Sequence, residues 1–205
     1  MAACRAIDQA PRQIDLHLPP SLRLDDDRLF AICEVNRELR IERNADGDLE
    51  IMPPTGAETG ARNADLTAEI AAWAKGDGRG VVFDSSTGFL LPNGAMRSPD
   101  VAWVLRTRLA ELSPQQKRHF LPLAPDAIVE LASPSDDPET LHRKMREWCD
   151  NGVQLGWLIL PDPRQVWEYR PDLEPVCLDE PQAISDEQRL PGLVLPLRTI
   201  WAPNF

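Results

Sequence analysis

The chain has 205 residues, of which 42% are hydrophobic, and a formal net charge of −11. This length can bury a sizeable core, so one domain is expected. The acidic charge argues against tight, non-specific binding to nucleic acid, because neutralising phosphates requires lysine and arginine. No apolar run is long enough to cross a membrane, so an integral membrane protein is not expected.

The first 20 residues predict a flexible arm, because Pro11, Pro19 and Pro20 interrupt them and they show no apolar periodicity. They also lack the apolar core of a secretory signal. The four cysteines of the chain form no Cys-x-x-Cys pair, so neither structural zinc nor a disulfide framework is expected. We therefore expect a cytoplasmic protein with a single domain over residues 21–205.

The first half of this domain predicts a helix, a hairpin, a longer helix and short strands. Asp25–Asp27 can cap a helix through residues 29–33. Residues 39–42 and 49–52 predict a hairpin around Asn44–Gly47. Apolar residues at helical spacing predict a helix over 59–74. Residues 81–83 and 88–91 follow as short strands.

The second half alternates strands with helices. Strands are predicted from 101 to 105 and from 127 to Glu130, with a helical stretch at 107–119, broken at Pro114, between them. A helix at about 133–151 precedes strands at 155–160 and 165–169, and the Pro-rich tail from Cys177 contains only short apolar pieces. This order predicts an α/β or α+β domain around one mixed sheet flanked by helices, after an N-terminal helix and hairpin.

Two acidic residues next to predicted neighbouring strands are the first candidates for chemistry. Asp100 directly precedes one strand and Glu130 ends another. Two such carboxylates can hold Mg²⁺, which prefers oxygen ligands. Asp100 could equally be a turn residue after Pro99. Glu130 ends an apolar strand, so it requires a metal ion, a cationic partner such as Arg97 or Arg143, or a place at the edge of the sheet.

Helix geometry selects Lys144 as the third candidate. At 100° per residue, Leu141, Met145 and Trp148 fall at about 0°, 40° and 340°, which makes one buried stripe. Lys144 falls at about 300°, on the flank of this stripe, so it is the cation of this helix best placed to reach back over the sheet. Near a metal site it could stabilise charge on a phosphate. The alternative is a lysine whose stem covers apolar surface while its ammonium stays in water.

Charge distribution also separates this region from the rest of the chain. Residues 97–146 contain eight lysines and arginines and seven acidic residues, a net charge of +1, so the remainder carries −12. The segment with the candidate residues is therefore the least acidic part.

The three histidines are scattered, and no Gly-x-Ser-x-Gly elbow or complete dinucleotide fingerprint is present, so no residue set supports a small-molecule hydrolase.

Several short motifs, in the same order along residues 35–200, resemble the Uma-two family. This bacterial family, notably cyanobacterial, is described as restriction endonucleases of the PD-(D/E)XK nuclease superfamily. The matching motifs are Met52–Gly56, Phe83–Phe89, Leu91–Ala95, Arg97–Asp100, Val129–Leu131 with Ser133–Ser135, Lys144–Met145, Asn151–Val153 and Gly156–Leu158.

The resemblance implies roles for individual residues. Pro99-Asp100 resembles the "PD" of the superfamily, and Glu130 resembles its second acidic residue. The lysine expected two positions later is Ala132 here, and Lys144 on the next helix fits as its displaced equivalent. The implied metal ligands are Asp100, Glu130 and Leu131, and Glu42 is similar to a further acidic residue of the family's N-terminal hairpin.

The resemblance thus implies a restriction-endonuclease-like fold and a Mg²⁺-dependent or Mn²⁺-dependent endonuclease acting on DNA. A homodimer is expected by analogy with nucleases that cut both strands. The alternative is a catalytically silent module of the same fold that binds nucleic acid or a protein partner, because a fold does not fix a function.

Overall fold

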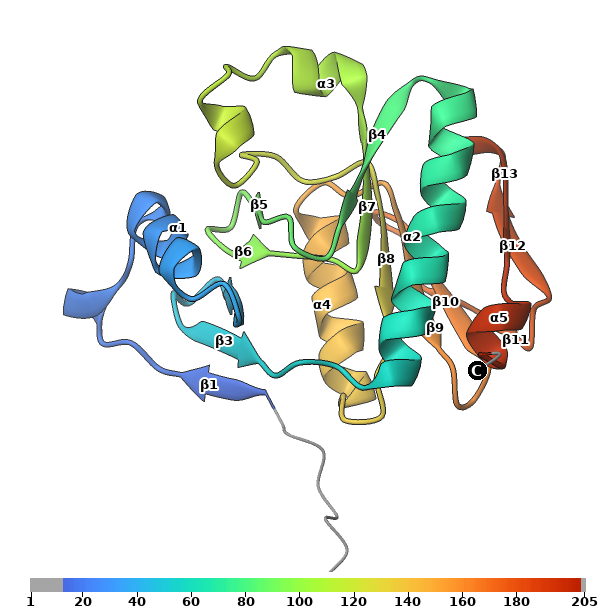
Figure 1. Ribbon diagram of the computed structural model, residues 1–205, viewed down its shortest axis with the longest axis horizontal. Coiled ribbons are helices and arrows are strands. Elements are labelled where there is room, and N and C mark those ends of the chain that lie inside the picture. Colours follow the sequence, from blue (N-terminus) through green and yellow to red (C-terminus); the bar gives the residue numbers. More distant parts are fainter. Residues whose placement is uncertain (1–12, 204–205) are drawn as a thin grey trace, which may run out of the picture.

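A six-stranded mixed sheet forms the centre of the computed structural model, which describes residues 13–203 (Figure 1). The strand order is β11-β10-β9-β8-β7-β4, and only β8 and β9 are parallel, joined by helix α4 (Pro138–Asp150). The strands are β4 (Gly80–Asp84), β7 (Val101–Leu105), β8 (Ala127–Leu131), β9 (Leu155–Leu160), β10 (Gln165–Tyr169) and β11 (Val176–Asp179). The prediction of a mixed central sheet flanked by helices is therefore confirmed.

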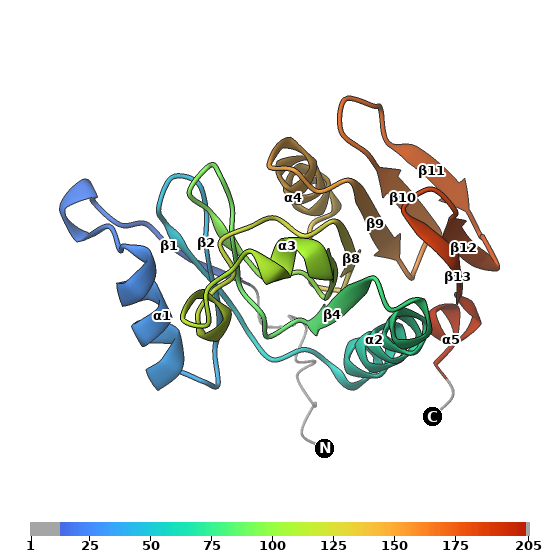
Figure 2. The same ribbon diagram turned by 90° about the horizontal axis from the view of Figure 1, so that it is seen from above.

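Helices α2 (Ala57–Asp77) and α4 cover opposite faces of this sheet, as Figure 2 shows from above. Odd-numbered residues of β7 and β8, such as Val129, pack with Leu66 and Ile70 of α2. Even-numbered residues, such as Ile128, pack with Met145 of α4. Because successive side chains of a strand point to opposite faces, Glu130 faces α4.

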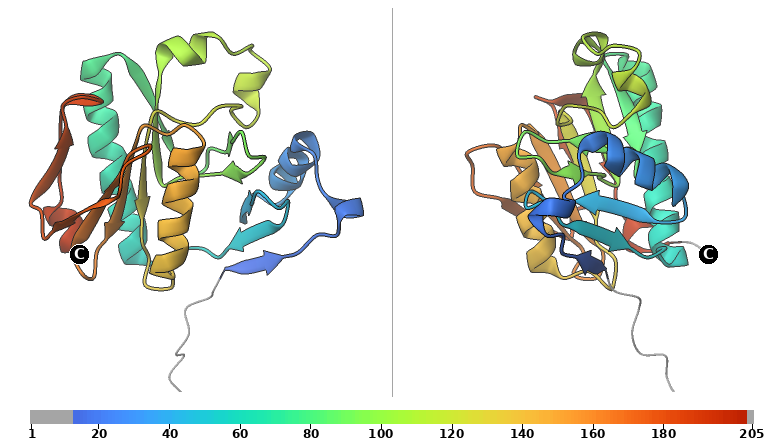
Figure 3. Two further views of the ribbon diagram at one scale, coloured as in Figure 1. Left: turned by 180° about the vertical axis from the view of Figure 1, so that it is seen from behind. Right: turned by 90° about the vertical axis from the view of Figure 1, so that its left-hand side faces the viewer.

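A second, five-stranded sheet is formed largely by the N-terminal part of the chain. Its strand order is β1-β3-β2-β6-β5. Helix α1 (Asp26–Val35) is capped by Asp25, as predicted, and packs on this sheet through Leu29. The strands are β1 (Ile14–Leu16), β2 (Arg40–Arg43), β3 (Leu49–Met52), β5 (Phe89–Leu90) and β6 (Met96–Arg97), after the 3-10 turn η1 (Pro20–Leu22). Only residues 98–100 separate β6 from β7, so the two sheets meet there; Figure 3 shows this junction from two sides.

The remaining elements complete the sides of the molecule. Helix α3 (Arg106–Ala110) and the 3-10 turn η2 (Gln116–Arg118) lie between β7 and β8. The hairpin of β12 (Ala183–Asp186) and β13 (Leu190–Pro196) and helix α5 (Arg198–Trp201) pack against α2. In the part of the chain that is described, no helix combines the length and the apolar character needed to span a membrane.

Several segments differ from the elements predicted from the sequence; the helical stretch predicted at 107–119, for example, is only the short helix α3 and the turn η2. Part of the predicted arm, Ile14–Leu16, pairs with β3 as an edge strand, while residues 1–12 lie outside the described residues. The tail contains β12, β13 and α5, which the sequence did not predict because its apolar pieces are short and separated by prolines. Their stability comes from packing on α2, a contact that no local pattern encodes.

The close approach of β4 to Trp103 provides a test of this packing. A Cβ atom added to Gly80 would lie 2.2 Å from the indole of Trp103, which is buried and stacks with Trp73. We expect Gly80→Ala to lower the free energy of unfolding by about 1–3 kcal/mol through overpacking. Gly76→Ala, in open space on α2, should raise it by about 0.5–1 kcal/mol. Urea unfolding measures both, and equal effects would contradict the packing.

Candidate functional site

Three buried carboxylates converge where the two sheets meet. Glu42 comes from β2, Asp100 from the residue before β7, and Glu130 from β8. A buried carboxylate is costly unless it is paired with a cation and hydrogen-bonded. The hydrogen bonds and ion pairs of each carboxylate therefore indicate how the site is stabilised.

Glu42 has the most complete set of partners. Its Oε1 accepts a hydrogen bond from the Ser98 amide at 3.1 Å and lies 3.2 Å from Lys144 Nζ, while Oε2 lies 3.2 Å from Arg97. Burial alone would raise the pKa of Glu42, but Lys144, Arg40, Arg97 and the Ser98 amide lower it to about 2. The carboxylate is therefore ionised at neutral pH.

Glu130 is in a less favourable environment for charge. Its Oε1 accepts a hydrogen bond from Trp148 Nε1 and lies next to Lys144 Nζ, both at 3.0 Å. Burial raises the pKa of Glu130, Lys144 opposes this, and the nearby Asp100 and Glu42 raise it further. The cation that the sequence required is thus Lys144, while the alternatives Arg97 and Arg143 bind other groups.

Asp100 links three elements. Its Oδ2 accepts a hydrogen bond from the Leu131 amide at 2.8 Å, which joins the start of β7 to β8. Its Oδ1 accepts from Arg40 of β2 and from Asn63 Nδ2 of α2, both at 3.3 Å. Asp100 does lie in the bend before β7, but it is buried and its carboxylate bonds three other elements.

Lys144 lies between Glu42 and Glu130, and only 14% of its side chain is exposed. Burial lowers the pKa of Lys144, but the two carboxylates outweigh burial and raise it. An ammonium held in this way does not extend into water, so the alternative of a solvent-directed lysine is wrong. Its position on the flank of the α4 stripe agrees with the helix geometry derived from the sequence.

The ion-pair network extends further than the sequence indicated. Arg97 also pairs with Glu50 and with Glu147, the latter at 2.7 Å. The connected network thus contains the five carboxylates Glu42, Glu50, Asp100, Glu130 and Glu147 and the three cations Arg40, Arg97 and Lys144. Two negative charges are left without a cation in this network. The only signal in the sequence is the alternation Arg40-Ile41-Glu42, which places two charges on one face of β2.

The residues present fit a divalent cation with oxygen ligands. Within residues 13–203, no group of three or more His, Cys, Asp or Glu side chains is arranged as a metal cluster. However, the network has an excess of two negative charges, and Asn63 Oδ1 is buried beside Asp100 without a hydrogen-bond donor among the described residues. A buried orphan oxygen and unbalanced carboxylates are the ligand types that Mg²⁺ and Mn²⁺ prefer.

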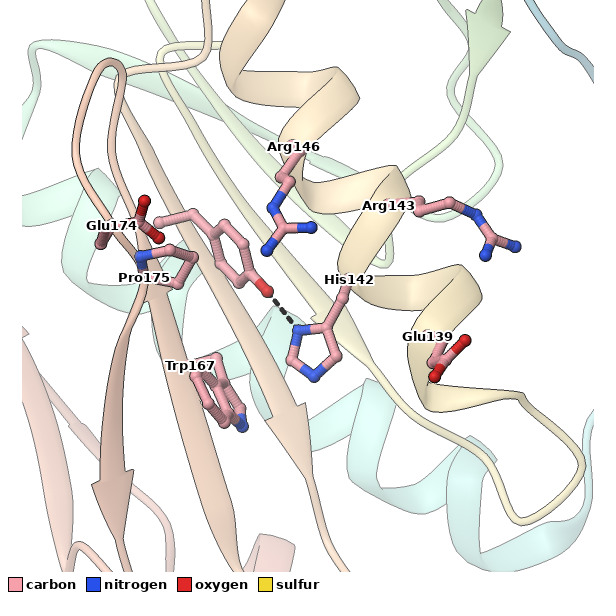
Figure 4. A pocket seen from close by; sticks show the side chains of 8 residues that line it. Glu139, His142, Arg143, Arg146, Trp167, Glu174 and Pro175 are labelled. Carbon is pink, nitrogen blue, oxygen red and sulfur yellow. Dashed lines mark hydrogen bonds between the residues drawn. The ribbon is translucent and has the colours of Figure 1, made fainter.

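A cavity of about 430 Å³ lies on a different side of α4 (Figure 4). His142, Arg146, Trp167 and Tyr169 are among its lining residues, and His142 Nδ1 is hydrogen-bonded to the Tyr169 hydroxyl. On the helix, His142 and Arg146 are each about 160° from Lys144. None of the three candidate carboxylates lines this cavity, so it is separate from the candidate site.

Comparisons with known proteins identify a family and a related fold. Residues 26–198 match the family model Uma2, described as "Putative restriction endonuclease". A crystal structure from Anabaena variabilis, described as "a putative nuclease belonging to DUF820", shares 21% sequence identity with a TM-score of 0.67. The match covers 79% of this chain and 89% of that one, and at this identity it shows the fold alone. No curated protein matches the chain.

The lowered pKa of Glu42 predicts an acid-dependent loss of stability. An acid with a lowered pKa binds its proton more readily in the unfolded state. Ionised Glu42 therefore stabilises the fold above pH 4.5, its ordinary pKa, and this stabilisation is lost as the pH falls to about 2. Wild type should therefore lose about 3 kcal/mol more than Glu42→Gln across this range. Urea unfolding at several pH values measures the difference. A constant difference between the two proteins would contradict the ionised, paired state of Glu42.

Proposed function

Because the chain belongs to the Uma2 family, we propose that it is an endonuclease that hydrolyses phosphodiester bonds in DNA with Mg²⁺ or Mn²⁺. The observation that carries this proposal is the convergence of Asp100, Glu130 and Glu42 around the buried ammonium of Lys144, with two negative charges in excess. A cation site is an arrangement that accounts for carboxylates gathered in this way.

The cation would be held by Asp100, Glu130 and the main chain of Leu131. The Leu131 amide already binds Asp100, so the carboxylate and the end of β8 are kept close together. A bound divalent cation would supply an activated water and neutralise charge on the phosphate. Glu130 is in β8 and Asp100 directly precedes β7, so both carboxylates are positioned by strands of the central sheet, which favours a well-defined site.

Lys144 would act on charge that develops at the scissile phosphate. Its pKa is raised by Glu130 and Glu42 against the effect of burial, so the ammonium stays charged at neutral pH. Two carboxylate contacts hold it at a fixed point, as electrostatic stabilisation of a transition state requires. Glu42, which also binds Arg97 and the Ser98 amide, is the residue that positions Lys144.

The net charge of −11 constrains how DNA would bind. The three cations of the site are engaged by carboxylates, so most of the attraction for phosphate must come from the metal ion. By analogy with nucleases that cut both strands, we propose that the active form is a cytoplasmic homodimer. Each protomer would carry one nuclease domain over residues 21–205.

A catalytically silent module that binds nucleic acid or a protein partner is the second candidate. The observation in its favour is that Arg40, Arg97 and Lys144 already contact all three central carboxylates without a metal ion. In that case the network would serve only to join the two sheets.

Metal binding distinguishes the two candidates. Mn²⁺ or Mg²⁺ should raise the melting temperature of the wild type, because a ligand that binds only the folded state stabilises it by mass action. Asp100→Asn should abolish most of this rise, whereas Asp46→Asn, which removes the same charge from an exposed turn, should retain it. Differential scanning fluorimetry over a titration of each metal measures the shift. An equal rise in all three proteins would contradict the assignment of Asp100.

The role of Lys144 is tested by cleavage. Lys144→Ala should lower the rate of plasmid nicking by about a hundredfold or more, the loss of one electrostatic stabiliser. It should also destabilise the fold by about 3–5 kcal/mol, because two buried carboxylates lose their cation. Lys144→Arg retains the charge and should fold, yet should not restore activity, because a planar guanidinium does not replace a compact ammonium.

The measurement is nicking of supercoiled plasmid in Mg²⁺ and in Mn²⁺, with circular dichroism at the assay temperature as the control for folding. Equal rates for wild type and both variants would exclude Lys144 from the reaction. Metal binding without cleavage of any DNA or RNA would favour the silent module.

A further inference from the structure

Arg40 occupies the space between the carboxylates of the candidate site. Its guanidinium lies 3.3 Å from Asp100 Oδ1 and 3.4 Å from Glu42 Oε1, and it also binds the Ser98 carbonyl oxygen. Burial lowers the pKa of Arg40, but Asp100, Glu42 and Glu130 together raise it, so its charge interacts with all three carboxylates. Arg40 thus lies where a bound cation would have to approach them.

The guanidinium of Arg40 makes longer contacts with carboxylates than the other cations of the network. Both of its carboxylate contacts are at the long end of the hydrogen-bond range, and its Nε is buried without an acceptor among residues 13–203. Its side chain is 32% exposed, against 8% for Arg97, which contacts Glu147 at 2.7 Å. Arg40 is therefore the less enclosed of the two arginines, and one contact with the Ser98 carbonyl is its main link outside the carboxylates.

Asn63 provides a second, independent observation at the same carboxylate oxygen. Its Nδ2 donates to Asp100 Oδ1, which fixes the orientation of the amide and leaves Oδ1 as the orphan oxygen. An unpaired buried acceptor costs about 1–3 kcal/mol. Arg40 and Asn63 thus both donate a hydrogen bond to Asp100 Oδ1. Each of these two side chains also has a buried polar atom without a partner among the described residues, Nε in Arg40 and Oδ1 in Asn63. A divalent cation would satisfy the oxygen and repel the guanidinium.

We propose that Arg40 is a resident counter-ion that the divalent cation displaces from Asp100, and that Asn63 Oδ1 is the third protein oxygen facing the cation. This inference rests on the proposed function, because it concerns the same metal site. It accounts for the long carboxylate contacts of Arg40, for the orphan oxygen, and for the lack of a third acidic ligand among the described residues. It also predicts effects of opposite sign for two neighbouring residues.

The test is a Mn²⁺ titration of the full chain by isothermal titration calorimetry. Arg40→Gln removes the competing charge and should bind Mn²⁺ about tenfold or more tightly than wild type, because a unit charge close to the site strongly opposes the cation. Asn63→Leu preserves the shape but removes the oxygen, so it should bind about tenfold or more weakly. Arg37→Gln, which removes the same charge from an exposed residue before β2, should bind within about twofold of wild type.

Folding of the variants is part of the same experiment. Metal-free Arg40→Gln should melt below wild type, because Asp100 and Glu42 lose a counter-ion, and saturating Mn²⁺ should restore more of its melting temperature than it adds to wild type. If Arg40→Gln does not fold without metal, Arg40→Lys replaces it. The shorter ammonium cannot reach both carboxylates as the fork does, so Mn²⁺ affinity should rise by a smaller factor.

The outcomes separate this inference from the proposed function. Wild type that binds Mn²⁺, with unchanged or weaker binding in Arg40→Gln, would show that Arg40 does not compete with the cation. Unchanged binding in Asn63→Leu would exclude the amide oxygen. Folded wild type and Arg40→Gln that both bind no Mn²⁺ would overturn the metal-dependent function itself, together with the inference.

Discussion

Burial of negative charge at the junction of two sheets is the constraint on which the rest of the structure depends. Glu42 of β2, Asp100 just before β7 and Glu130 of β8 are all removed from water. Their partners must therefore be supplied by other elements: Arg40 by β2, Arg97 by β6, and Lys144 and Trp148 by α4. Since breaking a buried ion pair costs about 3–5 kcal/mol, the relative positions of these elements are specified by charge as well as by apolar packing.

The two carboxylates that share Lys144 differ in acidity. Glu42 has three cations and an amide nearby and its pKa is lowered to about 2, whereas burial and like charges raise the pKa of Glu130. A pair of neighbouring acids with opposite shifts is typical of sites where one group stays charged and the other responds to a ligand. A cation near Asp100 and Glu130 would act mainly on Glu130, because Glu42 is already compensated. The charge excess of the network is greatest around Arg97, which pairs with Glu50 and Glu147 as well as with Glu42.

The regular alternation of strands explains why one helix can serve both the core and the site. Even-numbered residues of β7 and β8 face α4, so Ile128 packs on its apolar stripe and Glu130 reaches Lys144 and Trp148 on the same helix. Trp148 combines both roles, since its ring is buried in the core and its indole nitrogen donates to Glu130. Odd-numbered residues face α2, whose own contribution to the site is limited to Asn63.

The sequence by itself determined the features that depend on neighbouring residues: the capped helix α1, the β2–β3 hairpin, the apolar strands, and the position of Lys144 on the flank of the α4 stripe. It also singled out Asp100, Glu130 and Glu42, through apolar context and motif resemblance. It did not indicate Asn63, Glu50 or Glu147, nor β12, β13 and α5, and it offered Arg97 as a partner of Glu130, whereas Arg97 pairs with Glu42, Glu50 and Glu147. These contacts join residues far apart in the chain, such as Lys144 with Glu42, 102 positions away, and Arg97 with Glu50, 47 positions away. Which charges meet is decided only when the sheets pack, because the cost of burying an unpaired charge is a property of the assembled interior.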